Sequence, residues 1–124
     1  MSLNEKKLIS EIALSLTKGK TIGWFQDKME FGPRALGNRS ILADPRSEKM
    51  QKNLNLKIKF RESFRPFAPI VLRKKAKKWF DLKCDSPYML LVANVHKSKK
   101  LEVKEKNFTG LRKLYLKRSV IPAV

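Results

Sequence analysis

The chain has 124 residues, 42% of them hydrophobic, and a formal net charge of +18 from 29 basic and 11 acidic side chains. This length suits one domain, residues 1–124, and the hydrophobic share excludes a generally disordered chain. Cys84 is the single cysteine and no apolar run reaches the length of a membrane span, so we expect a cytoplasmic protein without membrane association.

The amino-terminal part of the sequence predicts a helix followed by two strands. Residues 2–5 form a capping box, and apolar residues recur at helical spacing from Leu8 to Leu16, before Gly19. Residues 21–26 are typical of a buried strand, and residues 39–43 of a second strand. Between them, Gly32, Pro33 and Gly37 exclude a long regular element.

The rest of the sequence continues the alternation of helices and strands. An Asp-Pro pair at 44–45 predicts a helix to about residue 54, residues 58–64 are expected to be extended, and a lysine-rich helix runs from 72 to 80. Residues 70–72 and 89–95 are predicted strands, and the charged segment 96–106 a loop. We therefore predict an α/β (α+β) fold in which 21–26, 70–72 and 89–95 share one mixed sheet, covered by the first helix.

The basic residues fall into two populations. The 21 lysines are scattered along the chain, as on a solvated surface, and they predict non-specific attraction of polyanions. The eight arginines are concentrated, because five of them lie between positions 34 and 65. The planar arginine fork grips phosphate or carboxylate with two hydrogen bonds, which lysine cannot do, so this concentration indicates a binding geometry.

The first candidate site is the glycine-flanked segment 32–40, GPRALGNRS. Its glycines allow a ligand to approach the backbone, and the segment supplies charged and neutral donors from four side chains: Arg34, Asn38, Arg39 and Ser40. The alternative is a tight surface turn whose arginines pair with acidic neighbours, namely Asp27, Glu30 or Asp44.

The second candidate site is KFRESFR, residues 59–65. If this segment is extended, Lys59, Arg61 and Arg65 emerge on one strand face, while phenylalanines remain available for the core. A row of cations backed by aromatic residues suits a polyphosphate ligand, and the alternative is an exposed strand face. No metal site is expected, because His96 is the only histidine and no metal-ligand spacing occurs.

At these residues the sequence resembles a known family. MEFGPRALGNRSILADPR (29–46) and IKFRESFRPFAPIVL (58–72) are similar to the signature blocks of the nodulation and cephem-antibiotic O-carbamoyltransferases. SPYMLL (86–91) resembles a third block, and residues 121–124 add a weaker similarity. On two long arginine-rich blocks in the right order, the chain is identified as a member of this family.

The resemblance implies a division of labour between two domains. An amino-terminal Kae1-like domain carries a metal site and transfers the carbamoyl group to an acceptor hydroxyl. The carboxyl-terminal domain resembles the YrdC fold, a twisted mixed sheet with flanking helices, and combines carbamoyl phosphate with ATP, accompanied by Mg²⁺, to give carbamoyl-adenylate. This chain matches the carboxyl-terminal domain only.

The same resemblance implies roles for individual residues. Arg34, Lys59 and Arg65 become the catalytic cations that contact the ligands, and further binding residues are Asn38, Arg39, Ser40 and Arg61. Relatives continue beyond the position of Val124 into a Thr-His-Val-Asp-Gly block of the same domain. We therefore expect a fragment whose sheet and pocket are incomplete and whose own turnover is low.

The competing hypothesis is a basic nucleic-acid-binding module, favoured by the net charge of +18. Against it, the aromatic residues lie within hydrophobic blocks and do not form a stacking platform, and no recognition motif is present. We predict that mobility-shift titrations show only weak, sequence-independent binding that moderate salt abolishes. Sequence-selective binding that persists at moderate salt would contradict this and favour the module.

Overall fold

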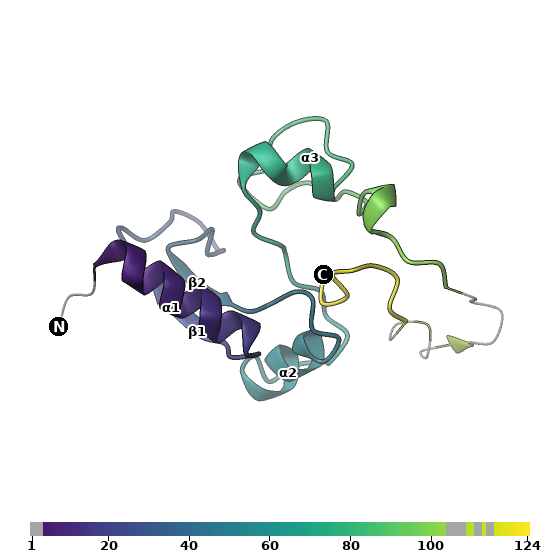
Figure 1. Cartoon of the computed structure of the whole chain (residues 1–124), viewed down its shortest axis with the longest axis horizontal. Helices are drawn as coiled ribbons and strands as arrows, with labels where there is room; N and C mark the ends of the chain where they lie inside the picture. The colour runs from purple at the N-terminus through teal and green to yellow at the C-terminus, as the bar shows by residue number, and fades with distance from the viewer. Residues whose placement is uncertain (1–3, 104–108, 111–112, 114–115) are drawn as a thin grey trace. The chain divides into compact units, whose positions relative to one another are not determined.

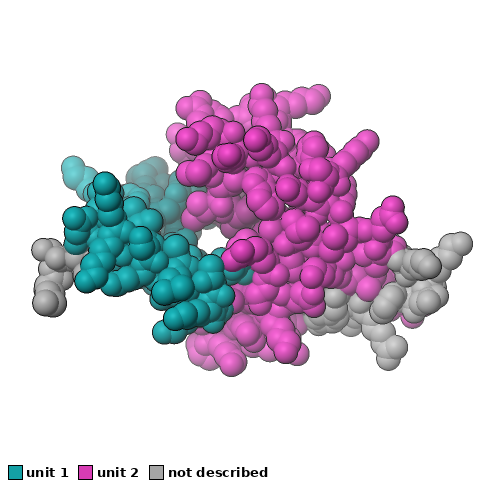
Figure 2. All heavy atoms as spheres, in the orientation of Figure 1, with its two compact units in different colours: residues 1–44 teal, residues 45–124 magenta. Residues whose placement is uncertain are grey.

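A computed structural model describes residues 4–103, 109–110, 113 and 116–124 of the chain (Figure 1). The chain forms two compact units, residues 1–44 and residues 45–124 (Figure 2). The first candidate segment therefore belongs to the first unit, and the second candidate segment belongs to the second. Within the described residues no helix combines the length and the apolar character that a membrane crossing requires.

The first unit begins with helix α1, Glu5–Thr17, as the hydrophobic spacing predicts. Its N-cap is Asn4, whose side chain accepts a hydrogen bond from the Lys6 amide at 3.1 Å, and not Ser2, which lies outside the described residues. At the other end Gly19 adopts φ 75°, and its amide donates to the Leu16 carbonyl at 2.9 Å. This left-handed glycine ends the helix.

Helix α1 packs beside a β-hairpin (Figure 1). Strand β1, Ile22–Phe25, pairs antiparallel with strand β2, Arg39–Leu42, so that Phe25 lies opposite Arg39. Both predicted strands of this unit are confirmed. Because the pairing is antiparallel, the long β1–β2 connection begins and ends at neighbouring points, which places Gln26 beside Asn38 of the first candidate segment.

The second unit contains helix α2, Met50–Lys57, which begins later than the Asp-Pro pair predicts. The carbonyl of Pro45 accepts a hydrogen bond from the Ala123 amide at 3.2 Å. In a helix starting at Pro45, that carbonyl would pair with residue 49 instead. In this structure the Pro45 carbonyl pairs with the end of the chain and not with a helical amide, and the predicted start is wrong by about one turn.

The lysine-rich helix is confirmed in a short form. A 3₁₀ turn η1, Arg73–Lys75, leads into α3, Ala76–Trp79. Phe80 then forms an isolated antiparallel bridge with Val95, and the His96 amide donates to the Trp79 carbonyl at 2.8 Å. The predicted loop that follows contains a second 3₁₀ turn, η2, Lys97–Lys99, and its residues 104–106 lie outside the described part of the chain.

The predicted sheet through residues 70–72 and 89–95 is wrong, and residues 58–64 are not extended as a strand. Phe60 and Met89 adopt φ 48° and 55°, in the left-handed region that no β-strand permits. Pro66 and Pro69 bring no amide donors to a ladder, and among residues 89–95 only Val95 forms a bridge. Within the described residues the sheet has two strands, so the fold is the predicted α/β class with an incomplete sheet.

The core of the second unit is assembled from segments far apart in the sequence. The buried apolar residues come from α2, from the end of α3 and from the end of the chain: Met50, Leu54, Phe80, Ile121 and Ala123. The small number of these residues makes each one important for stability.

We predict that Leu54→Ala lowers the free energy of unfolding by about 2–3 kcal/mol, because it opens a cavity in this core. Leu54 is 6% exposed, whereas Leu56 on the same helix is 46% exposed. Leu56→Ala is therefore the matched control and should cost less than about 1 kcal/mol. Urea unfolding followed by circular dichroism measures both, and equal losses would show that Leu54 contributes no more to the core than Leu56 does.

Candidate functional site

The β1–β2 connection, which carries the first candidate segment, is held by a carboxylate. Glu30 Oε1 accepts hydrogen bonds from the backbone amides of Leu36 at 2.8 Å and Asn38 at 2.5 Å. These amides, that of Asn38 foremost, lower the pKa of the Glu30 carboxyl. Glu30 therefore organises the loop backbone, and it pairs with no arginine side chain among the described residues.

Arg39 forms a second brace across the base of this loop. Its guanidinium donates to the backbone carbonyls of Gln26 at 2.5 Å, Asn38 at 2.9 Å and Asp27 at 2.7 Å, and lies 3.5 Å above the centre of the Phe25 ring. Asp27 adopts φ 48°, which turns the chain toward the guanidinium. The alternative of a tight surface turn thus holds for Arg39 in that its guanidinium is bound within the turn. Its partners, however, are backbone carbonyls and not the acidic side chains that this alternative predicts.

Two further residues of the segment lie close to this brace. The Asn38 side chain donates to the Lys28 carbonyl at 2.8 Å and accepts from Gln26 Nε2 at 3.3 Å. Ser40 lies half-buried on β2, opposite Trp24. Asn38, Arg39 and Ser40 are therefore brought together at the end of the hairpin where the loop departs.

Arg34 differs from these residues. It is exposed between Gly32 and Gly37, which adopt φ 109° and 128°. No hydrogen bond or ion pair joins its side chain to the described part of the chain. The loop thus has a braced base and an arginine that is available to an anion.

In the second unit, helix α2 holds the turn at residues 61–65 through two side-chain amides. Asn55, fully buried, donates from Nδ2 to the carbonyls of Ser63 at 3.1 Å and Arg65 at 2.8 Å. One helical turn earlier, Gln51 donates from Nε2 to the carbonyls of Phe64 at 3.0 Å and Arg65 at 3.1 Å. The main chain of the second candidate segment is thereby fixed to the helix.

The three cations of this segment do not share a strand face, because Phe60 at φ 48° reverses the chain between Lys59 and Arg61. Arg61 donates from Nε to Asn55 Oδ1 at 2.7 Å and lies 5.0 Å from the centre of the Phe67 ring. The Lys59 side chain is exposed and makes no hydrogen bond or ion pair with the described residues.

The Arg65 side chain pairs with Glu62, Nε to Oε2 at 2.9 Å. Both side chains are about half exposed, at 55% and 53%. The Glu62 pKa is lowered, first by a backbone hydrogen bond within its own residue and then by Arg65. An exposed ion pair of this kind contributes little free energy, so a phosphate can displace Glu62 readily.

Sequence reasoning missed Gln51 and Asn55, and it named Glu30 only as a possible partner of an arginine side chain. Asn55 carried a detectable signal, since it lies among apolar residues in LNL of α2, where an amide needs internal partners. The sequence signal for Glu30 is weaker: it is an acidic residue just before the glycine-rich turn. Only the folded loop shows that its partners are backbone amides.

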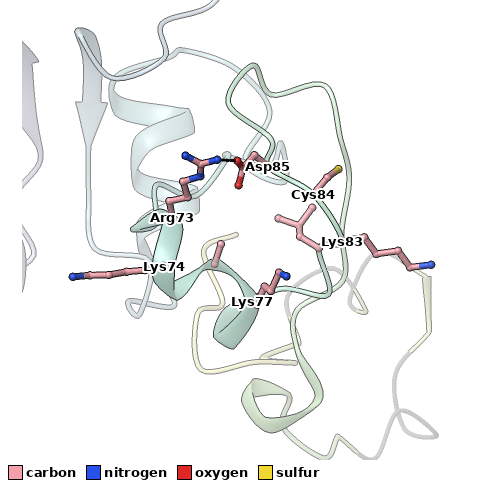
Figure 3. A pocket seen from close by; sticks show the side chains of 8 residues that line it. Arg73, Lys74, Lys77, Lys83, Cys84 and Asp85 are labelled. Atoms are coloured by element: carbon pink, nitrogen blue, oxygen red, sulfur yellow. Dashed lines mark ion pairs between the residues drawn. The ribbon is translucent and has the colours of Figure 1, made fainter.

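A depression on the second unit is lined by other residues. It measures about 520 Å³ and is lined by a cationic group with one acidic residue: Arg73, Lys74, Lys77, Lys83 and Asp85 among others (Figure 3). Arg73 and Asp85 form an ion pair across it, which raises the Arg73 pKa. None of the predicted site residues lines this depression, and its exposed lysines provide charge without a fixed geometry.

Comparison with known proteins identifies the chain's relatives. The family model described as Carbamoyltransferase C-terminus matches residues 13–123. An uncharacterized protein of Synechocystis sp. is 49% identical over 123 residues, which cover 98% of this chain and 20% of that protein. The nodulation protein NolNO of Sinorhizobium fredii is 47% identical over 94 residues, covering 73% of this chain and 14% of NolNO.

A third relative is the 3'-hydroxymethylcephem-O-carbamoyltransferase of Amycolatopsis lactamdurans, 40% identical over 88 residues, which cover 71% of this chain and 17% of that enzyme. The chain thus spans a fifth or less of the length of these relatives. Both candidate segments fall inside the matched range. The chain belongs to the carbamoyltransferase C-terminus family.

Proposed function

We propose that this chain is the carbamoyl-activating part of an O-carbamoyltransferase. It would bind ATP and carbamoyl phosphate, form carbamoyl-adenylate, and pass the activated group to an amino-terminal Kae1-like domain for transfer to an acceptor hydroxyl. Family membership supports carbamoyl transfer, and the name of the cephem relative supports a hydroxyl oxygen as acceptor. The activation step is supported by the chemistry of the two arginine-rich segments.

The proposal is supported by a contrast among the cations of the two segments. The guanidinium groups of Arg39 and Arg61 are hydrogen-bonded to protein groups, whereas three other cations remain available to a ligand. Within the described residues Arg34 and Lys59 have no side-chain hydrogen bond or ion pair, and the side chain of Arg65 has one exposed partner, Glu62. The Arg65 carbonyl is held by Asn55 and Gln51, and Glu30 holds the loop backbone at Leu36 and Asn38, beyond Arg34. The Lys59 amide donates to the Leu54 carbonyl of α2 at 2.9 Å. Available cations on a preorganised backbone are what phosphate recognition requires.

The reaction can be balanced from its two substrates. Carbamoyl phosphate and water give inorganic phosphate and carbamate. A carbamate oxygen then bonds to the α-phosphorus of ATP while the bond from that phosphorus to pyrophosphate breaks. The nucleophile is already an anion, so this second step requires no general base. It requires cations that cancel the repulsion between the substrates and the charge on the leaving pyrophosphate.

We assign Arg34, Lys59 and Arg65 to those charges. Asn38, Arg39, Ser40 and Arg61 are proposed as further binding residues. Arg39 and Arg61 already donate to protein groups, so they would hold the site's shape and offer their remaining donors.

Mg²⁺ is proposed as a companion of ATP and not as a metal held by this chain. Among the described residues no group of three or more histidine, cysteine or acidic side chains could hold a metal ion. Mg²⁺ bound to the ATP phosphates would neutralise part of their charge. The chain's own contribution is to orient the nucleotide and carbamoyl phosphate.

We predict that Arg34→Ala, Lys59→Ala and Arg65→Ala each lower carbamoyl-adenylate formation by at least about tenfold, because each removes a charge-assisted hydrogen bond to phosphate. The variants are made in the carbamoyltransferase that joins this domain to its amino-terminal partner. Pyrophosphate release at fixed ionic strength measures the rate, and thermal melting checks the fold. Arg65→Lys should recover only part of the loss, because lysine keeps the charge without the fork.

The matched controls are Lys7→Ala and Lys77→Ala, which change the net charge equally at exposed positions outside both segments. Their rates should stay within about twofold of the parent, because salt screens distant surface charges. If the controls lose as much as Arg34→Ala, the motif cations are part of a diffuse field and the assignment of the site fails.

A further inference from the structure

Helix α2 directs two amide side chains at the segment that carries Arg61 and Arg65. Asn55 is 0% exposed, and it engages both donors of its amide group and its side-chain oxygen. Its backbone carbonyl also accepts from the Arg61 amide at 3.0 Å. All four of these hydrogen bonds lead to residues 61–65, a stretch of chain outside helices and strands.

Gln51 strengthens the same attachment from one helical turn away. Its Nε2 donates to the carbonyls of Phe64 and Arg65, so the Arg65 carbonyl accepts from both amides, at 2.8 Å from Asn55 and 3.1 Å from Gln51. The Arg65 backbone is therefore fixed, while its guanidinium remains about half exposed. The charged group thus starts from a fixed main chain, and its guanidinium is held only by the exposed ion pair with Glu62.

Asn55 also fixes Arg61 directly. The guanidinium is held through Nε by Asn55 Oδ1 and lies beside the Phe67 ring, so its plane is constrained on two sides. No hydrogen bond occupies its two terminal nitrogens within the described part of the chain. In an arginine that binds phosphate, these two terminal nitrogens donate the paired hydrogen bonds to phosphate oxygens.

A packing role alone does not account for this arrangement. Burying an amide costs free energy unless its groups are hydrogen-bonded, and an apolar residue would fill the same space without that requirement. Here every side-chain hydrogen bond of the two amides ends on the cationic segment. The arrangement selects one backbone conformation for that segment.

We propose that Asn55 and Gln51 are positioning residues of the activating reaction, which act by presenting Arg61 and Arg65 to phosphate. The proposal rests on the function proposed above, in which these arginines contact ATP or carbamoyl phosphate. Neither amide touches the ligands itself, so their substitution should act through the arginines.

The decisive variant is Gln51→Met, which keeps the length of a half-buried side chain and removes both donors to the segment. Lys52→Met introduces the same residue at the adjacent exposed position and is its control. In the joined carbamoyltransferase, Gln51→Met should lower kcat/KM for pyrophosphate release by about fivefold to tenfold, as the loss of one or two neutral hydrogen bonds implies. Lys52→Met should change it by less than about twofold.

A double-mutant cycle separates positioning from support of the fold. In an Arg65→Ala background, Gln51→Met should have less than about a twofold further effect, because the group it presents is gone. Asn55→Asp, which keeps the acceptor for Arg61 but places an oxygen against two carbonyls, should also lower kcat/KM. Its control is Asn53→Asp at an exposed position of the same helix.

The outcomes distinguish this inference from the proposed function. If Arg65→Ala retains full activity, the proposed function fails. If Arg65→Ala loses activity while Gln51→Met matches Lys52→Met, or if the losses from Arg65→Ala and Gln51→Met multiply, the positioning role is overturned. If Asn55→Asp does not fold, the double-mutant cycle of Gln51→Met with Arg65→Ala still tests the positioning role, because Gln51→Met leaves the buried Asn55 amide in place.

Discussion

The turn at residues 61–65 depends on hydrogen bonds that regular secondary structure does not supply. A main chain outside helices and strands must still satisfy its carbonyls, and here the carbonyls of Ser63, Phe64 and Arg65 find their donors in the side chains of α2. The buried Asn55 amide is satisfied by the same contacts. Helix α2 and the turn therefore satisfy each other's hydrogen-bonding groups. These hydrogen bonds fix the backbone conformation of the cationic segment.

In the first unit, charged side chains satisfy the backbone groups of a loop outside helices and strands. The glycine-rich loop has backbone amides near its end and carbonyls near its start, so Glu30 accepts from the amides and Arg39 donates to the carbonyls. Arg34 lies between these two attachments. In both units the residues that define the backbone are distinct from the cations that remain available, which explains why arginines of one motif can have unlike roles.

The elements that follow from local patterns could be predicted from the sequence: α1 from its apolar spacing and the hairpin strands from their apolar runs. Residues 58–64 and 89–95 could not, because the left-handed φ values of Phe60 and Met89 depend on tertiary contacts and not on residue type. The positions of the candidate cations could be predicted from the clustering of arginines along the sequence. Their division into braced and available groups could not be predicted, because it depends on carbonyls across the hairpin, such as those of Gln26 and Asp27.

The contacts from α2 to the turn end on main-chain oxygens, and this sets which positions of the domain can vary. Every residue offers the same carbonyl, so an exposed position such as Phe64 can accept many side chains while the attachment persists. Positions 51 and 55 have no such latitude, because few side chains place an amide at that reach. In a set of variant sequences, positions 51 and 55 should therefore tolerate fewer replacements than position 64.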